Sequence, residues 1–396
     1  MTALVMRAPG SKSQTQRALL LAALARGEST LIGAVACDDS RYLRQALAQL
    51  GAGVVVAPDG SWQVKGLDGR PRQPGGELDA GEGGTTLRFL APLALLLDAP
   101  LRLNGHGRLG RRPLDGLLSA LARLGVQASR PEQEQPLPLT LQRMGPAGRC
   151  TSVEVHRSSQ FASALLMVGP CLPRGLDLTL DGPLVSRPYL EMTVAAMARF
   201  GVTCTLSDHR ALVEPGHYAA CNLEVEGDWS AGAFLLAAGW ISGRALEVPN
   251  LAPDSRQGDR AMVELLGRLD QPGPRSFSLA ACPDLVAPLA AACALARGTS
   301  RIIDVAHARL KESDRLAVLA RGLSRAGVGV EEHPDGLTIE PASTPRPVRL
   351  DPAGDHRMAM AFGLLSLRQP GITVEDPGCV AKSYPGFWDD LARFRP

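Results

Sequence analysis

Lysine is nearly absent from this 396-residue chain. Its 42 basic residues divide into 38 arginines and only four lysines, at Lys12, Lys65, Lys311 and Lys382. A buried lysine can lose its proton near neutral pH, whereas arginine stays charged, so only the lysine can serve as an acid or a base. The few lysines that the chain retains are therefore candidates for chemistry.

Long apolar runs, paired cysteines and basic runs are also missing. No apolar run reaches the ~18 residues of a membrane span, and the N-terminus lacks the pattern of a signal peptide. We therefore expect a soluble cytoplasmic protein with no membrane partner. The eight cysteines include no C-x-x-C pair, which argues against a disulfide framework or a zinc site and for reduced, mostly buried thiols. A net charge of +2 without a Lys/Arg-rich run argues against nucleic acid as a partner.

Aromatic residues make up only 4% of the chain, but 45% of the residues are hydrophobic. Large cores built mainly from Leu, Ala and Val are therefore expected. At about 150 residues per domain, the length suggests two or three domains.

One sequence unit recurs six times. It begins with a polar residue, continues as an apolar helix, from about Thr15 to Arg26 in the first copy, and closes with a glycine turn and a short strand. The polar starts are Ser13, Thr85, Ser158, Ser230, Asp284 and Asp355. In most copies a second helix follows and stops at a glycine such as Gly51 or Gly125, which is typical of a left-handed C-cap. Each copy therefore predicts the order strand–helix–strand–helix–strand–strand.

The first helix of each copy is apolar nearly all round, which predicts burial on every side. A solenoid would leave such helices partly exposed. We therefore expect an α/β (α+β) protein of two globular domains with three units each, the helices inside and the sheets outside, joined near residues 226–228. The polar helix starts could then face one cleft between the domains, and a helix N-terminus attracts anions.

Three further motifs carry charged residues. The run 309–316, R-L-K-E-S-D-R-L, would as one helix place Lys311 and Arg315 on the same face, with Glu312 about 100° away; alone, it is typical of a salt-bridged surface helix. The loop 105–113, G-H-G-R-L-G-R-R-P, is basic, and C-V-A-K carries the last lysine. A P-loop protein is excluded because G-x-x-x-x-G-K-[ST] is absent.

Taken together, the motifs resemble the enolpyruvyl transferase family, in particular its shikimate-pathway branch. The matching motifs, in family order, are P-G-S-K-S-x-x-x-R, G-x-G-G-T-x-x-R, S-S-Q-F-x-S-A-L-L-M, L-V-S-R-P-Y, R-L-K-E-S-D-R-L, D-H-R-M-A-M and C-V-A-K, and they span Pro9 to about Leu391. The resemblance implies a two-domain inside-out α/β barrel of six βαβαββ repeats. Residues 10–225 would form the first domain and residues 226–396 plus 1–9 the second, with the active site in the cleft.

The resemblance also implies an activity. The family moves the enolpyruvyl group of phosphoenolpyruvate to the 5-hydroxyl of shikimate 3-phosphate and releases phosphate, in the pathway to aromatic amino acids. We expect those two small molecules as the partners of a monomer, and no metal or organic cofactor.

Matching motif positions carry over candidate roles. The residues that resemble shikimate 3-phosphate contacts are Lys12, Ser13, Arg17, Ser158, Ser159, Gln160, Ser186, Tyr189, Asp284, His307 and Lys311. The residues that resemble phosphoenolpyruvate contacts are Lys12, Gly84, Arg88, Arg108, Gln160, Arg315, Arg357 and Lys382. The residues expected to act in catalysis are Asp284, Glu312, Lys12, Lys382 and His356. The cations fit this chemistry, since each phosphate monoester brings a charge of about −1.5 to −2 and each substrate adds a carboxylate.

The chain also departs from the family pattern. Glu82, Gln16 and His307 stand where asparagine is usual, Phe89 replaces a proline, and Trp229 replaces a small residue. These departures leave open a paralogue that uses another phosphorylated cyclic acceptor, and a non-catalytic binding protein of the same fold is a further alternative. The sister transferase on UDP-N-acetylglucosamine is disfavoured, because the loop 105–113 lacks the reactive cysteine of that family.

Overall fold

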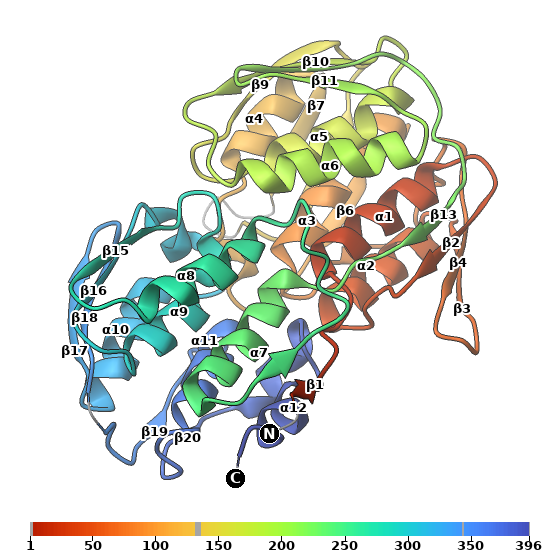
Figure 1. Ribbon diagram of the computed structural model, residues 1–396. Coiled ribbons are helices and arrows are strands. Elements are labelled where there is room, and N and C mark those ends of the chain that lie inside the picture. The colour runs from red at the N-terminus through yellow and green to blue at the C-terminus, as the bar shows by residue number, and fades with distance from the viewer. Residues whose placement is uncertain (1–2, 131–135, 343, 396) are drawn as a thin grey trace. The chain divides into compact units, whose positions relative to one another are not determined.

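The computed structural model describes residues 3–130, 136–342 and 344–395 (Figure 1). The chain divides into two compact units, one formed by residues 10–225 and the other by residues 226–396 together with 1–9. The chain passes from one unit to the other after Pro9 and again after Val225. Each unit has its own hydrophobic core.

The 10–225 unit consists of three copies of one motif. Each copy has a four-stranded sheet in which the first two neighbours run parallel and the other pairings are antiparallel. The sheets are β13 (Asn222–Glu224), β2 (Glu28–Ile32), β4 (Trp62–Lys65), β3 (Gly53–Val56); β5 (Leu78–Asp79), β6 (Leu101–Asn104), β8 (Leu139–Arg143), β7 (Val126–Ser129); and β9 (Cys150–Glu154), β10 (Leu176–Asp181), β12 (Arg210–Val213), β11 (Cys204–Leu206). The helices are α1 (Lys12–Leu24), α2 (Asp38–Gln49), α3 (Gly84–Leu90), α4 (Asp115–Arg123), α5 (Gln160–Val168) and α6 (Arg187–Arg199), with 3₁₀ turns η1 (Ala91–Leu96), η2 (Leu109–Arg111) and η3 (Gly169–Cys171).

The 226–396 unit has one sheet of the same kind and two shorter strand pairs. The sheet is β15 (Arg275–Ser278), β16 (Ser300–Ile303), β18 (Gly336–Glu340) and β17 (Gly329–His333), and the pairs are β1 (Leu4–Val5) with β14 (Leu246–Glu247) and β19 (Arg349–Leu350) with β20 (Thr373–Val374). The helices are α7 (Trp229–Ser242), α8 (Met262–Leu269), α9 (Val286–Cys293), α10 (Arg315–Arg325), α11 (His356–Leu365) and α12 (Phe387–Ala392), with 3₁₀ turns η4 (Gly258–Ala261), η5 (Pro283–Leu285), η6 (Ala306–Leu310) and η7 (Pro377–Lys382).

The predicted unit order is confirmed in four copies and is wrong for the fourth and sixth. After α8 the chain turns through residues 271–274 directly into β15, and in the described part of the chain no strand follows β20, only η7 and α12. The 54 residues from Ser230 to Asp284, against about 72 between the other starts, leave no length for a closing strand pair in the fourth copy. Two copies are thus shorter than the resemblance implied.

Near each of the two points where the chain passes between the units, a strand pairs with a strand that is distant in sequence. β1 precedes the first copy in sequence but pairs in parallel with β14 of the fourth copy, and β13 precedes the fourth copy but pairs with β2 of the first. Each unit is therefore completed by a strand from a distant part of the chain.

The apolar helices are buried, as predicted. In α1 every residue from Thr15 to Leu24 is buried, and α9 is buried along its whole length. The glycines after the second helices adopt left-handed φ angles, 99° at Gly51 and 94° at Gly125, which confirms the predicted C-caps. The mixed α/β class is thus confirmed.

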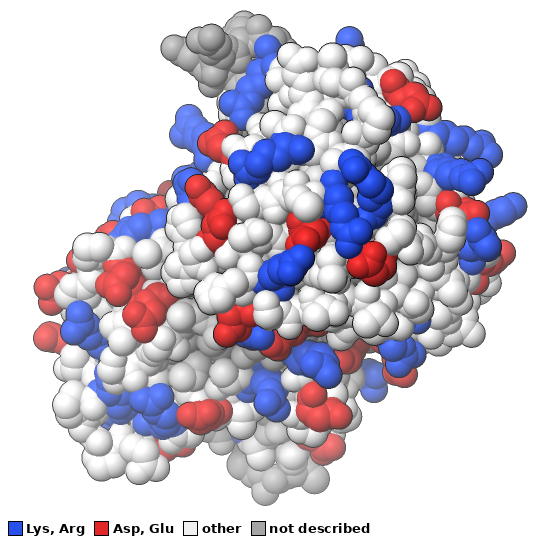
Figure 2. Space-filling view, turned by 90° about the horizontal axis from the view of Figure 1, so that it is seen from above, with Lys and Arg blue, Asp and Glu red and all other residues white. Residues whose placement is uncertain are grey.

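The surface charges, the helix lengths and the burial of the cysteines can be compared with what the sequence predicts. On the face shown in Figure 2, basic and acidic side chains are interspersed. Within the described ranges no helix has both the length and the apolar character needed to cross a membrane. Of the eight free cysteines four are buried, three are half-buried and Cys150 is exposed, so "mostly buried" holds for only half of them.

Candidate active site

The first helix begins at a turn that only glycine can form. A Cβ at Gly10 would overlap the carbonyl of Gly33, so a larger residue would push these segments apart. Ser11 then caps α1, accepting a hydrogen bond from the Gln14 N–H at 3.4 Å, and Lys12 becomes the first helical residue. The predicted start near Thr15 was one turn late because this cap lies further upstream.

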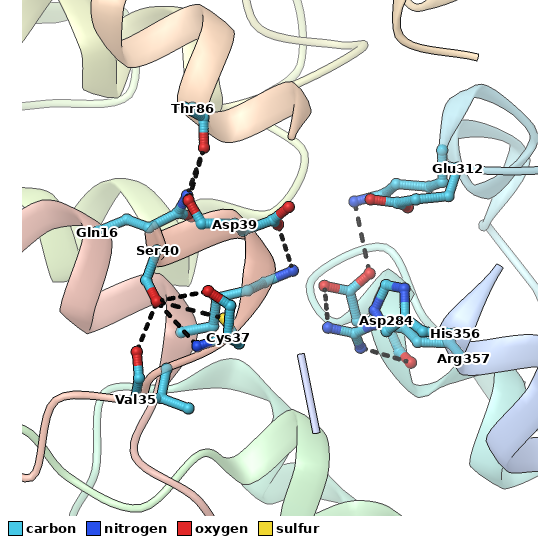
Figure 3. A network of polar contacts seen from close by, with 12 residues as sticks. Gln16, Val35, Cys37, Asp39, Ser40, Thr86, Asp284, Glu312, His356 and Arg357 are labelled. Carbon is cyan, nitrogen blue, oxygen red and sulfur yellow. Dashed lines mark hydrogen bonds and ion pairs between the residues drawn. The ribbon is translucent and has the colours of Figure 1, made fainter. Parts of the chain in front are cut away.

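Lys12 is paired with an aspartate that the sequence did not point to. Its Nζ lies 2.9 Å from Asp39 Oδ2, and Asp39 is 4% exposed. The main-chain oxygen of Asp39 accepts hydrogen bonds from Thr86 Oγ1 at 3.1 Å and Gln16 Nε2 at 3.5 Å, and Gln16 Nε2 also donates to Thr86 Oγ1 at 2.9 Å (Figure 3). The departure at Gln16 thus joins the starts of α1, α2 and α3, which fixes the direction of Lys12.

Arg17 is a buried cation held by neutral oxygens. Nε donates to Thr193 Oγ1 at 2.8 Å, and the two terminal nitrogens donate to the carbonyls of Ser13 at 2.9 Å and Tyr189 at 3.1 Å. The ring of Phe89 lies 5.4 Å from the guanidinium carbon. Burial lowers the pKa of Arg17 to about 10, partly offset by Tyr189, so it stays charged at neutral pH. A buried guanidinium bonded only to neutral oxygens is well suited to binding an anion.

Two further arginines lie at α3, Arg88 in its last turn and Arg112 against its start. Arg88 donates to Gln160 Oε1 at 2.6 Å and to the carbonyl of Pro113 at 2.7 Å, so two predicted residues from α3 and α5 lie together. Arg112, which the sequence did not single out, covers Gly84: a Cβ there would overlap its guanidinium carbon and lie 2.8 Å from Nη2. A larger residue at position 84 would therefore displace this guanidinium from the helix start.

Glu82, a departure from the family pattern, faces the basic loop. The carboxylate of Glu82 lies so close to Gly107 that a Cβ on Gly107 would overlap it, and Gly107 has a φ of 62°. Arg108 of the same loop is exposed at the start of η2. The described hydrogen bonds and ion pairs of this unit do not join Arg108 to the other predicted residues.

The remaining predicted residues of this unit lie at two other helix starts. Ser159 is buried at the N-cap of α5, and Ser158 Oγ accepts from the Gln160 N–H at 3.2 Å. Ser186 is buried at the N-cap of α6 with a left-handed φ of 55°, and the Tyr189 N–H donates to its carbonyl at 3.1 Å. The main-chain carbonyl of Tyr189 also accepts a hydrogen bond from Arg17, so the start of α6 contacts the side chain of Arg17 from α1.

Arg315 is the centre of the candidate residues in the 226–396 unit. It is 1% exposed and contacts three carboxylates: Nε lies 2.9 Å from Asp355 Oδ2, Nη1 2.8 Å from Asp284 Oδ1 and Nη2 2.8 Å from Glu312 Oε2. Asp355 caps α11, accepting from the Arg357 N–H at 3.0 Å. The capping rule identified Asp355 as a helix start, but nothing local indicated that it holds Arg315.

Asp284 is surrounded by cations. Besides Arg315, Lys311 Nζ lies 3.5 Å from its Oδ1 and Arg357 Nη2 lies 3.2 Å from its Oδ2 (Figure 3). Burial alone would raise the pKa of Asp284, but Arg357, Lys311 and Arg315 together lower it well below the usual value. The carboxylate is therefore ionised in the absence of substrate and is a weak base.

The prediction of a single helix over 309–316 was wrong. Residues 306–310 form η6, Lys311 is extended, and α10 begins only at Arg315, where Asp314 caps it by accepting from the Ala317 N–H at 3.1 Å. Asp314 favours a cap over a helix interior, so the run breaks there. The turn, rather than helical spacing, brings Lys311, Glu312 and Arg315 to the same place.

Two histidines and the last lysine are the remaining candidate residues of the 226–396 unit. His307 is 9% exposed, and burial, with a further contribution from Lys311, lowers its pKa to about 4, so it is neutral above pH 6. Its Nε2 is buried without a hydrogen-bond partner among the described residues. His356 is fully buried with Nδ1 3.6 Å from Asp355 Oδ1, and Lys382 is 6% exposed at the end of η7.

A further acid, Asp259, lies close to this cluster. It is 2% exposed and accepts a hydrogen bond from Ser230 at the start of α7. Burial and the charge of Asp284 raise its pKa to about 6, although Arg357 acts in the opposite direction. Among the described residues no group of three or more His, Cys, Asp or Glu side chains is placed to hold a metal ion.

In each unit, cations at helix starts lie beside buried carboxylates, Lys12 beside Asp39 and Arg315 and Arg357 beside Asp284. Such an arrangement is typical of enzymes that bind anionic substrates and exchange protons with them. Comparison with known proteins gives the family. The model of the EPSP synthase (3-phosphoshikimate 1-carboxyvinyltransferase) family matches residues 2–391, and the chain belongs to this family.

Individual relatives agree over nearly the full length. The 3-phosphoshikimate 1-carboxyvinyltransferase of Methanoregula boonei is 36% identical over 97% of this chain and 95% of its own, and that of Syntrophobacter fumaroxidans is 37% identical over 98% and 96%. The solved structure of the EPSP synthase from Acinetobacter baumannii aligns with a TM-score of 0.79 at 22% identity, covering 99% of this chain and 95% of that chain. The chain is thus an enzyme of the transferase class with the fold of that structure.

Proposed function

We propose that this protein transfers the enolpyruvyl group of phosphoenolpyruvate to the 5-hydroxyl of shikimate 3-phosphate and releases phosphate. The observation that carries the proposal is the cluster around Asp284, in which one buried carboxylate contacts Arg315, Lys311 and Arg357. These residues lie in the runs that resemble family motifs, and the chain belongs to that family. We also propose that the protein acts as a monomer in the cytoplasm. A light-scattering mass near 41.8 kDa would support the monomer.

The proposed reaction has two steps. In the addition, the 5-hydroxyl oxygen bonds to C2 of phosphoenolpyruvate, the hydroxyl loses its proton, and C3 gains one. In the elimination, C3 returns a proton, the C2–O bond to the phosphoryl group breaks, and inorganic phosphate leaves. We assign Asp284 as the base for the hydroxyl and Glu312, with Lys12 or Lys382, to the proton transfers at carbon.

Substrate binding is what would make Asp284 basic enough for this role. In the free protein its cations hold its pKa low. Anions bound to Lys311 and Arg357 would bring negative charge beside Asp284 and share its cations, and both effects raise a carboxylate pKa. Asp284 would thus accept a proton only when both substrates are present.

The remaining candidate residues are assigned to the two substrates by the family motifs that they resemble and by their charge. Arg17, with Ser13, Ser158, Ser159 and Tyr189, would take the anionic groups of shikimate 3-phosphate, together with Lys12, Gln160, Ser186, His307 and Lys311. Arg88, Arg108, Arg315, Arg357 and Lys382, with Lys12, Gln160 and the start of α3 at Gly84, would bind phosphoenolpyruvate. Arginine suits these roles because its planar fork bonds carboxylate and phosphate with two parallel hydrogen bonds.

The direct test measures phosphate release from purified protein supplied with both substrates. We expect Asp284→Asn and Glu312→Gln each to lower kcat about 10²–10⁴-fold, while Asp389→Asn, an exposed aspartate of α12 outside the cluster, stays near wild type. Near-normal turnover in either cluster variant would overturn its assigned role. A folded wild-type protein that releases no phosphate would overturn the function and favour another phosphorylated acceptor.

A further inference from the structure

The 226–396 unit contains a cavity whose lining is distinct from the candidate active-site residues. It has a volume of about 1110 Å³ and lies where α7, α8 and α9 end, lined by parts of residues 236–246, 269–273 and 295–298 and by Arg368. Asp284 precedes α9 and His356 begins α11, whereas the cavity residues 295–298 follow the end of α9 and Arg368 follows the end of α11. None of the residues that line the cavity belongs to the candidate active site.

The cavity wall is positively charged. Arg244, Arg297 and Arg368 line it, against a single acidic residue, Asp270, whose carboxylate accepts a hydrogen bond from Trp240 Nε1 at 2.9 Å. Arg244 is held in place by donating to the main-chain oxygens of Arg393 and Arg395. The cavity therefore has an excess of positive charge.

A fourth arginine lies directly behind the wall. Arg275 donates to the carbonyl of Arg297, and its Nη2 is 3.6 Å from a Cβ built on Gly298. Its Nε and Nη1 are buried without hydrogen-bond partners among the described residues. Buried unpaired donors are rare and costly, so the positive charge here is not neutralised by the protein.

The rest of the cavity wall is apolar and includes one planar aromatic ring. Leu236, Leu246, Leu295 and the indole of Trp240 are half-buried along it. An aromatic face beside arginines favours a planar ring that carries a negative charge, since the ring stacks on the indole while the charge meets the guanidinium groups. A volume slightly above the usual ligand range of about 300–1,000 Å³ leaves room for such a molecule.

We propose that this cavity is a binding site for a small amphipathic organic anion, with a planar apolar body and one carboxylate or similar acidic group. An inorganic anion would leave the apolar wall in water, and a neutral ring would leave the arginines without counter-charge. The site is separate from the proposed catalytic groups, and the proposal does not depend on the proposed function.

The probe for a first experiment is naphthalene-2-sulfonate, titrated calorimetrically into the full chain with shikimate 3-phosphate present in excess. We expect saturable one-to-one binding that is at least tenfold tighter than that of the neutral naphthalene-2-methanol. Arg297→Ala and Arg368→Ala should each weaken sulfonate binding about fivefold. The control Arg325→Ala, an exposed arginine at the end of α10 outside the cavity, should stay within twofold of wild type.

Several outcomes would overturn the proposal. These are the absence of saturable binding, equal affinity for the neutral compound, or sulfonate binding that the two cavity variants leave unchanged. Loss of sulfonate binding on adding shikimate 3-phosphate would also overturn it, because the probe would then occupy the anion-binding groups elsewhere. Circular dichroism and phosphate release of the variants, both expected to match wild type, show that the exposed substitutions leave the fold intact.

Discussion

Replacing Arg315 with glutamine tests how far one buried cation holds the 226–396 unit together. The guanidinium is 1% exposed and contacts Asp284, Glu312 and Asp355 at 2.8–2.9 Å. Removing it leaves three carboxylates close together with little water, so the loss should reach the range measured for breaking a buried ion pair, about 3–5 kcal/mol. For a unit of this size each kcal/mol lowers Tm by about 2–4 °C, which predicts a decrease near 10 °C.

The loss should also depend on pH. In the wild type the pKa of Asp284 is held well below its usual value, so its stabilising contribution is present above about pH 4 and is lost as the pH falls through the native pKa. Without Arg315, Asp284 loses one of the cations that lower its pKa, so its pKa rises, and uptake of a proton at lower pH relieves part of the repulsion among the three carboxylates. The difference from wild type should therefore be largest at neutral pH and smaller at pH 5.

The assay is thermal and urea unfolding of Arg315→Gln at pH 7.5 and pH 5. Arg325→Gln serves as the matched control, because Arg325 is exposed at the other end of the same helix and should change stability by less than about 0.5 kcal/mol. A loss below about 1 kcal/mol at pH 7.5, or an equal loss at both pH values, would refute the reasoning that the arginine neutralises a buried acidic cluster.

Three further predictions concern single residues. Gly84→Ala should push the Arg112 guanidinium aside and raise KM for phosphoenolpyruvate about tenfold while KM for shikimate 3-phosphate changes little; steady-state kinetics that show equal changes for both substrates would contradict this. In the wild type the pKa of His307 is near 4 in the folded protein, so between about pH 6.5 and 4 only the unfolded chain takes up the proton, and stability falls as the pH falls. His307→Asn should therefore make the free energy of unfolding less dependent on pH in this range. Unfolding curves with the same pH dependence in variant and wild type would argue against this. Arg17→Lys should raise KM for shikimate 3-phosphate about 10²-fold despite keeping the charge, since an ammonium cannot hold the three-way hydrogen bonding of the buried guanidinium; wild-type kinetics in this variant would exclude that role.

Local features of the chain could be predicted because their causes are local. Apolar residues on all sides require burial, and the glycines at 51 and 125 relieve the strain of a left-handed residue, so buried helices and their ends were readable from the sequence. The start of α1 was misplaced by one turn only because Ser11 rather than a later residue caps it. The repeat also revealed where polar helix starts occur.

Contacts between distant segments could not be read in the same way. Hydropathy says nothing about which strand pairs with which, so the pairing of β1 with β14 and of β13 with β2 came only from the structure. Asp39 beside Lys12 and Arg112 over Gly84 carry no sequence pattern of their own, since each acts through a neighbour brought near by folding.

The run 309–316 shows both what could be predicted from the sequence and what required the tertiary structure. The sequence by itself determined that Lys311, Glu312 and Arg315 form a charged cluster, which it placed wrongly on one helix, and that a buried apolar helix starts near Asp284. Only the tertiary structure decided that Asp314 breaks the run and that Arg315 turns inward to Asp284 and Asp355. The physical reason is that a charged side chain can be buried only where opposite charges from other segments meet it, and the chain must fold before those segments are neighbours.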